Sequence, residues 1–138
     1  MIKKSSKFVL FSLADYTYAL PLATVAKFVE FDSFCAIPGA DKNIKGLIYY
    51  EGKIITIFDS AKLLGLSIKY PDKLQTLLFS HQDKSYGLLV SEALETVKSA
   101  QIFVDKKKKQ FKKYIKIKDN KIYILEPEEI IQILNIND

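Results

Sequence analysis

Short apolar runs of strand length recur along the whole chain, and small groups of turn-forming residues separate them. This pattern is typical of an antiparallel, mainly β protein rather than of alternating strands and helices. Val25 to Phe31 is predicted to be extended or partly helical. The other expected strands are Lys7 to Leu13, Tyr16 to Leu20, Ile44 to Tyr50, Lys53 to Phe58, Leu74 to Ser80, Ser85 to Val90, Leu94 to Ile102, Tyr114 to Lys118 and Ile122 to Leu125.

The residues between these runs predict three hairpins and one isolated turn. Glu51-Gly52 predicts a tight hairpin, because Gly52 has no Cβ where the backbone must turn sharply. His81 to Lys84 and Asp119-Asn120 are polar turns between apolar flanks. Ile37-Pro38-Gly39 predicts a type II turn, in which proline restricts one backbone angle and glycine takes the positive φ that follows.

Two helices are expected, both short. Asp59 can cap a helix of one or two turns, and Gly65 suits the position just after its end. Pro127 fits the first position of a C-terminal helix, and two acidic residues follow it at the positive end of the helix dipole. The apolar side chains that would share one face of that helix are Ile130, Ile133 and Leu134.

Length and cysteine content predict one cytoplasmic domain over residues 1–138. The 138 residues contain no composition break that would mark a linker. Two small barrels sharing one core are plausible from the number of strands, but no boundary between them can be assigned. Cys35 is the only cysteine and cannot form an internal disulfide, which fits a reducing compartment.

The N-terminal residues have two possible interpretations. Lys3, Lys4 and Lys7 before the apolar residues 8–14 resemble a secretion signal, but Asp15 interrupts the apolar run early. We therefore interpret these residues as the first strand. No apolar stretch approaches the roughly 20 residues of a membrane helix, so direct membrane insertion is not expected.

The positive charge is concentrated in one segment. The net charge is +5, and six lysines lie between Lys106 and Lys113. We interpret this segment as a solvated loop between two strands, with binding to an acidic partner or a lipid surface as the alternative. A small basic β-barrel that binds nucleic acid is a rival function, although the sequence separates the lysines from most aromatic residues.

An enzymatic function is not expected, and no catalytic, cofactor-binding or metal-binding residue can be assigned. His81 is the only histidine and lies in a predicted polar turn. Cys35 is expected to be a small buried hydrophobic residue without a neighbour that would activate its thiol. Helix capping fully accounts for Asp59. Function by surface contact remains. The candidate exposed aromatic anchors are Phe28, Phe31, Tyr49 and Tyr50, although completion of the core is the favoured interpretation of these residues.

The order and spacing of weak motifs over nearly the whole chain resemble the CheW-like domain family. These motifs are Phe8 to Phe11, Tyr18 to Leu22 leading into Val25, Ile37 to Ala40, Ile44-Lys45-Gly46, the turn at Gly52, Ile54 to Ile57 ending at Asp59, Tyr86 to Val90 followed by Val97, and Ile124 to Leu134.

The resemblance implies a fold of two small five-stranded β-barrels packed side by side and a function without a cofactor. Members of this family couple the cytoplasmic tips of chemoreceptors to the histidine kinase CheA, whose regulatory domain has the same fold. The receptor tip docks in an apolar groove between the barrels, and the kinase contacts barrel ends. Carried over by position, the implied partner-binding residues are Val25, Lys27, Gly46, Tyr49, Tyr50, Glu51 and Gly52.

Two of these positions depart from the family pattern. The family usually has Asn-Leu-Arg-Gly at the turn, where this chain has Tyr49-Tyr50-Glu51-Gly52, so an arginine is replaced by an acid. Lys27 stands where an acidic residue is common. The alternative to a conventional coupling adaptor is therefore a divergent relative that does not join receptor–kinase arrays.

Overall fold

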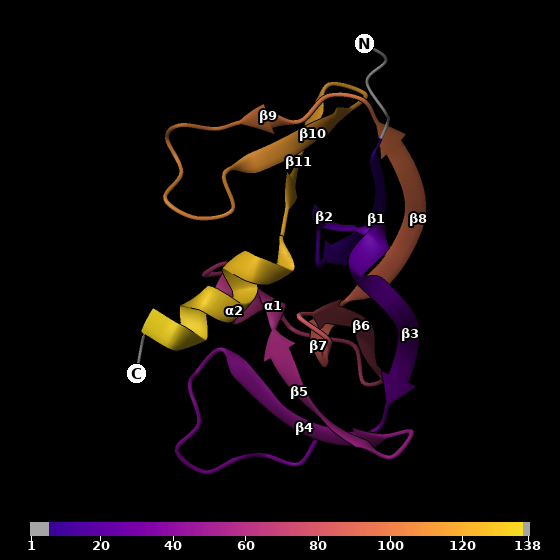
Figure 1. Ribbon diagram of the computed structural model, residues 1–138, viewed down its shortest axis with the longest axis vertical. Coiled ribbons are helices and arrows are strands. Elements are labelled where there is room, and N and C mark those ends of the chain that lie inside the picture. Colours follow the sequence, from indigo (N-terminus) through magenta and orange to yellow (C-terminus); the bar gives the residue numbers. More distant parts are fainter. Residues whose placement is uncertain (1–5, 137–138) are drawn as a thin grey trace.

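The computed structural model describes residues 6–136, which form two β-sheets and short helices (Figure 1). The six-stranded sheet, which we call the first sheet, has the order β8-β1-β2-β11-β10-β9. Its strands are β1 (Ser6–Leu13), β2 (Tyr16–Pro21), β8 (Glu92–Ser99), β9 (Phe103–Val104), β10 (Lys113–Ile117) and β11 (Asn120–Ile124). The five-stranded sheet, which we call the second sheet, has the order β3-β6-β7-β5-β4. Its strands are β3 (Val25–Phe31), β4 (Ile44–Tyr50), β5 (Lys53–Asp59), β6 (Leu74–His81) and β7 (Lys84–Val90). Each sheet contains one parallel pair, β2 with β11 and β5 with β7, whereas the sequence predicted antiparallel pairing.

The helices are those expected, with one addition. The predicted short helix is α1 (Ser60–Leu63), and the Asp59 carboxylate accepts a hydrogen bond from the backbone N–H of Lys62 at 3.3 Å. The C-terminal helix is α2 (Pro127–Ile136). A 3-10 helix, η1 (Leu22–Thr24), precedes β3, which is a strand throughout. The side chain of Leu134 lies outside the described part of the structure, as do Lys3 and Lys4.

All three predicted hairpins form, and each has a two-residue turn with positive φ at both positions. Glu51 and Gly52 have φ of 50° and 79°, the geometry that matches the twist of the flanking strands. The second turn is shorter than predicted, because His81 pairs with Lys84. The third lies one residue earlier than predicted, because Ile117 pairs with Asn120. The turn at Pro38-Gly39 forms as expected, with Gly39 at φ 76°.

Two of the most continuous apolar runs of the sequence, in β1 and β7, are strands buried on both faces. Leu10 of β1 packs in the core of the six-stranded sheet, whereas Phe11 faces a core shared by the two sheets. On β7, Leu88 lies in the shared core and Leu89 packs inside the five-stranded sheet. The shared core also receives Ile130 of α2. Strands of this kind read as continuous apolar runs because neither face alternates with solvent.

The two sheets correspond to the two small packed β-units implied by the resemblance, with six and five strands rather than five each, and neither closes into a complete barrel within the described residues. Within residues 6–136, the ladders of the first sheet end at β8 and β9, the short β9 being its sixth strand. The second sheet curls until its edges approach each other. Backbone hydrogen bonds link Cys35 to Leu47 of β4, and the rings of Phe31 and Tyr50 meet edge to face at 6.2 Å. These backbone hydrogen bonds and this ring contact together partly close the second sheet.

Candidate partner-binding surface

Three of the predicted partner-binding residues meet at one end of the second sheet. The Nζ of Lys27 on β3 lies 3.4 Å from Oε1 of Glu51 in the β4–β5 turn and 5.4 Å from the ring centroid of Tyr50. The Tyr50 hydroxyl and the Glu51 carboxylate together raise the pKa of Lys27. Both charged side chains are more than half exposed, so the pair orients the turn more than it stabilises the fold.

An exposed apolar pair lies beside this ion pair. Tyr49 of β4 and Ile54 of β5 are directly opposite each other and are 74% and 70% exposed. Sequence reasoning missed Ile54, although the predicted hairpin contained the signal. With a turn at Glu51-Gly52, the register pairs Tyr49 with Ile54 on the face opposite the buried Ile48 and Ile55. We call Lys27, Tyr49, Glu51, Gly52 and Ile54 the turn patch.

Two other predicted partner-binding residues, Gly46 and Val25, are fully or partly buried, as is Tyr50. Gly46 is buried, and a Cβ added to it would lie 2.7 Å from the carbonyl oxygen of Cys35. Val25 is half-buried and packs against the shared core. Tyr50 packs against Phe31 and is also half-buried. Of these three residues, Tyr50 contacts the turn patch through Lys27, while Tyr49 and Glu51 are exposed at its surface.

Two further apolar side chains are exposed on edge strands, one in each sheet. Phe28 of β3 is 41% exposed and Leu94 of β8 is 39% exposed. Figure 1 shows β3 and β8 on the same side of the molecule, one from each sheet. Of the four candidate aromatic anchors, Phe28 and Tyr49 are therefore exposed, whereas Phe31 and Tyr50 pack against each other.

The structure accounts for the residues considered for catalysis, and it corrects the prediction for Cys35. Cys35 is exposed rather than buried, because its backbone pairs with the edge of β4 and its side chain faces outward. His81 is half-buried at the end of β6. Asp59 accepts a hydrogen bond from the Tyr70 hydroxyl at 2.6 Å, and burial together with this bond raises the pKa of Tyr70. Among the residues described, no cluster of His, Cys, Asp and Glu could hold a metal ion.

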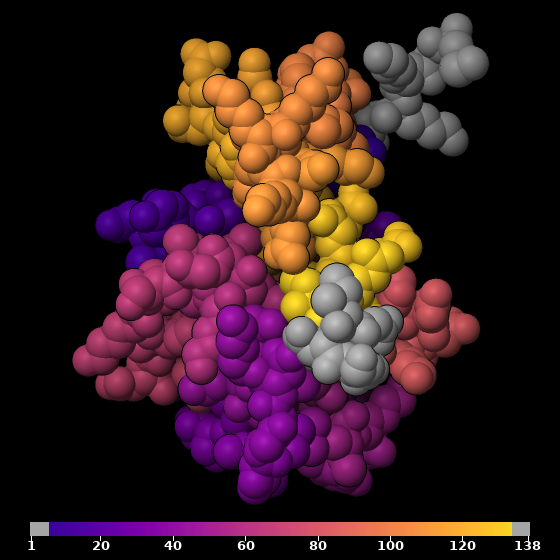
Figure 2. Space-filling model, turned by 90° about the vertical axis from the view of Figure 1, so that its left-hand side faces the viewer, coloured from indigo at the N-terminus to yellow at the C-terminus, as the bar shows by residue number. Residues whose placement is uncertain are grey.

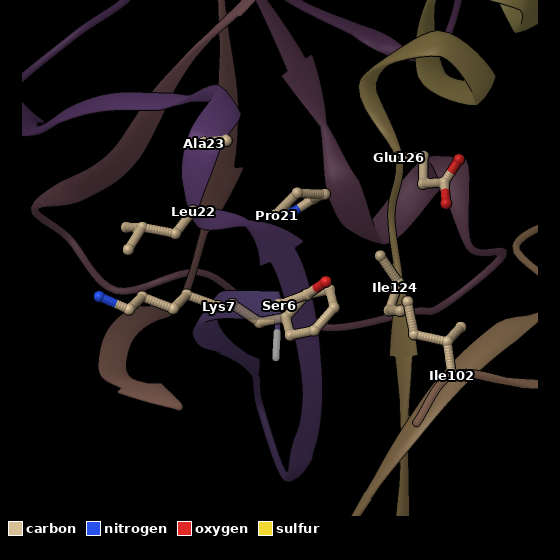
Figure 3. Close-up of a pocket in the computed structure, with 9 residues that line it drawn as sticks. Ser6, Lys7, Pro21, Leu22, Ala23, Ile102, Ile124 and Glu126 are labelled. Atoms are coloured by element: carbon tan, nitrogen blue, oxygen red, sulfur yellow. The ribbon is translucent and has the colours of Figure 1, made fainter. Parts of the chain in front are cut away.

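A hollow of about 490 Å³ opens at the end of the first sheet (Figure 3). Its walls include Pro21, Leu22, Ile102 and Ile124, and the view shows Ile102 close to Ile124. Glu126 on its rim pairs with Lys113 at 3.2 Å. None of the predicted partner-binding residues lines this hollow.

Comparison with known proteins identifies a sequence family and a similar solved structure. The family model described as CheW-like domain matches residues 7–138. The crystal structure of the scaffolding protein TtCheW from Thermoanaerobacter tengcongensis superimposes with a TM-score of 0.79 at 25% sequence identity, covering 88% of each chain. A search of curated protein sequences found no significant match.

Proposed function

The chain belongs to the CheW-like domain family, and from this membership we propose that it is a chemotaxis scaffold that couples chemoreceptors to the histidine kinase CheA. Family members are scaffolds rather than enzymes, so protein contacts alone would perform this function. The observation that carries the proposal is the turn patch, where two large apolar side chains lie exposed beside a charged pair.

The kinase regulatory domain is the partner that we assign to the turn patch. Tyr49 and Ile54 offer apolar area at an end of the second sheet, and a tyrosine at such a position buries much surface while few rotatable bonds become ordered. Lys27 and Glu51 would set the orientation of the partner, since charges at the rim of an interface determine specificity more than affinity.

The receptor tip is the partner that we assign to the exposed surface of the edge strands. Phe28 and Leu94 lie on β3 and β8, strands of different sheets on the same side of the molecule. Phe28 follows Lys27 of the turn patch on β3, but successive side chains of a strand point to opposite faces, so the chain could hold a receptor and a kinase at once. The cytoplasm, where both partners are found, is the location that we propose. No helix in the part of the chain that the structure covers is long and apolar enough to cross a membrane.

The test compares kinase binding by variants of the turn patch and of a matched surface. We expect the double variant Tyr49→Ala with Ile54→Ala to lose about 2–4 kcal/mol of binding free energy towards the regulatory domain of the native CheA, measured by isothermal titration calorimetry. Tyr16→Ala is the control, because Tyr16 is 53% exposed but lies on the first sheet. Unchanged affinity in the double variant would rule out the turn patch as the kinase contact.

A second arm of the same experiment asks whether the chain is a conventional or a divergent scaffold. Glu51→Arg should weaken binding to the native kinase domain by about 1–3 kcal/mol and improve binding to a kinase domain whose usual partner carries arginine at this turn. The fold should tolerate the change, because Glu51 is exposed. Asp72→Arg, an equal charge change on an exposed loop residue, serves as the control. If both domains bind Glu51→Arg as they bind the unchanged protein, position 51 makes no contact.

A further inference from the structure

The first sheet carries the densest positive charge of the molecule. Between Phe103 and Lys121 the chain has nine lysines and two aspartates. Figure 2 shows this orange region at one end of the molecule, with part of it lying against the yellow α2. The sequence suggested a solvated loop separated from most aromatic residues, but the tertiary structure places lysines directly on aromatic rings.

Three neighbouring strands contribute a row of aromatic rings, and each ring carries one lysine ammonium group. Phe103 of β9, Tyr114 of β10 and Tyr123 of β11 pair across the strands, with successive ring centroids 5.4 and 5.5 Å apart. The ammonium groups lie 4.8 Å from Phe103, 5.0 Å from Tyr114 and 3.7 Å from Tyr123. They belong to Lys116, Lys121 and Lys108, respectively, which we call the lysine face.

The loop that provides Lys108 is held in place by hydrogen bonds. The Asp105 carboxylate accepts one from the Tyr123 hydroxyl at 2.7 Å and one from the backbone N–H of Lys107 at 3.1 Å. The backbone N–H of Asp105 donates to the carbonyl of Lys112 at 2.8 Å. Positions restrained in this way lose less conformational entropy on binding than freely moving lysines would.

We propose that the lysine face binds an acidic segment of a protein partner. The rings that carry the ammonium groups lie 5.4 and 5.5 Å apart, a spacing similar to that of neighbouring side chains on one helix face or along one face of an extended strand, which could present acidic groups to them. The proposal is independent of the kinase contact, because the lysine face lies on the first sheet and the turn patch on the second.

The same geometry disfavours nucleic acid and lipid as the occupant. Base stacking needs open aromatic rings, whereas Tyr114 is only 9% exposed, Phe103 and Tyr123 are half-buried, and each ring has an ammonium group near it. The chain contains no arginine, so the bidentate contacts that read phosphates and guanines are missing. Aromatic rings that have lysine side chains next to them are also poorly placed to anchor in the interfacial layer of a membrane.

A titration with a short poly-L-glutamate peptide at low ionic strength tests the proposal. We expect the triple variant Lys108→Gln, Lys116→Gln, Lys121→Gln to bind about tenfold or more weakly than the unchanged protein, with a shallower dependence of affinity on salt. The matched control removes three exposed lysines elsewhere, by Lys42→Gln, Lys62→Gln and Lys69→Gln. Equal losses in the two triple variants, or no binding by the unchanged protein, would overturn the proposal.

Two further measurements distinguish an acidic polypeptide from other ligands and the lysine face from the turn patch. Vesicles containing phosphatidylglycerol and an oligothymidylate are titrated against the same proteins, and tighter binding of either one through the lysine face would replace the acidic polypeptide as occupant. Affinity of the triple variant for the kinase domain should stay unchanged, which separates this proposal from the proposed function. If the triple variant has a lowered melting temperature, Lys116→Gln alone should still weaken peptide binding.

Discussion

Gly46 lies where β4 passes closest to the segment that follows β3. Its backbone leaves no room for a side chain, because an added Cβ would meet the Cys35 carbonyl oxygen at 2.7 Å and the Phe34 Cβ at 3.1 Å. The neighbouring hydrogen bonds between Cys35 and Leu47 would have to lengthen to admit it. A residue expected from family position to contact a partner therefore shapes the hairpin that carries the turn patch.

Gly46→Ala should lower the free energy of unfolding by about 1–3 kcal/mol, because overpacking against backbone cannot be relieved by a side-chain rotation. Urea unfolding followed by circular dichroism measures the change. Gly39→Ala is the comparison, since its Cβ meets nothing within 4 Å and the variant suffers only from the positive φ of 76°. A Gly46→Ala protein as stable as the unchanged one would show that the strands separate easily at this point.

At the scale of elements, a single tyrosine holds the shorter α-helix, α1, to the loop that follows it. The Tyr70 hydroxyl donates to Asp59 and accepts from the backbone N–H of Ala61 at 3.0 Å, so it contacts the cap and the first turn of α1. Its ring packs against both the shared core and the core of the second sheet. A helix of only four residues is unstable in isolation, and this contact supplies what its own hydrogen bonds lack.

Tyr70→Phe should lower the free energy of unfolding by about 1–2 kcal/mol, because Asp59 and the Ala61 N–H lose a partner in partly buried surroundings. Tyr16→Phe, at an exposed position, should cost under about 0.5 kcal/mol. Thermal melts of the three proteins at neutral pH measure both changes. Equal stability of Tyr70→Phe and the unchanged protein would mean that water replaces the hydroxyl.

The same tyrosine predicts the direction of a pH effect. Its pKa is raised in the folded state, so its contribution to stability is complete below pH 10 and falls as the pH rises from there through the folded-state pKa. Tyr123, whose pKa of about 12 arises mainly from its hydrogen bond to Asp105, acts in the same direction in both proteins. The free energy of unfolding should consequently fall less steeply above pH 10 in Tyr70→Phe than in the unchanged protein. Identical dependence on pH in the two proteins would show that Tyr70 does not contribute to the alkaline loss of stability.

On the scale of the whole molecule, the shared core joins two sheets that would otherwise be separate units. Phe11 from the first sheet and Phe58 from the second are completely buried in it, together with Ile130 of α2. The chain enters the second sheet after β2 and returns to the first at β8, so residues 25–90 form one sheet between two segments of the other. Neither sheet alone can bury the side chains that point into the shared core.

The two sheets should therefore unfold in one transition. Phe58→Leu should lower the free energy of unfolding by about 1–3 kcal/mol. Native-state hydrogen exchange measures this separately for amides of the first sheet, such as Phe11, and of the second, such as Leu88. Equal reductions at both sites are expected, whereas a reduction confined to Leu88 would show that the sheets unfold independently.

The local features of this fold could be predicted from the sequence. Strands, hairpins and helix starts depend on residues a few positions apart: Gly39 and Gly52 accept positive φ, and Asp59 caps the helix that follows it. The mainly β class and the CheW-like family followed from the order of such features. The turn patch was partly predictable, because Glu51 lies in a recognisable hairpin turn and Tyr49 lies close to it on β4.

Contacts between distant residues were decided by the tertiary structure alone. The outward pairing of Ile54, the exposure of Cys35, the ion pair from Lys27 to Glu51 and the placement of lysines on the rings of the first sheet all depend on strand register or sheet curvature. A shift of one residue in a ladder moves every side chain to the opposite face. Turn chemistry is encoded within a few residues, whereas register and curvature result from the packing of the whole chain, so the surfaces that bind partners emerge only when the sheets pack.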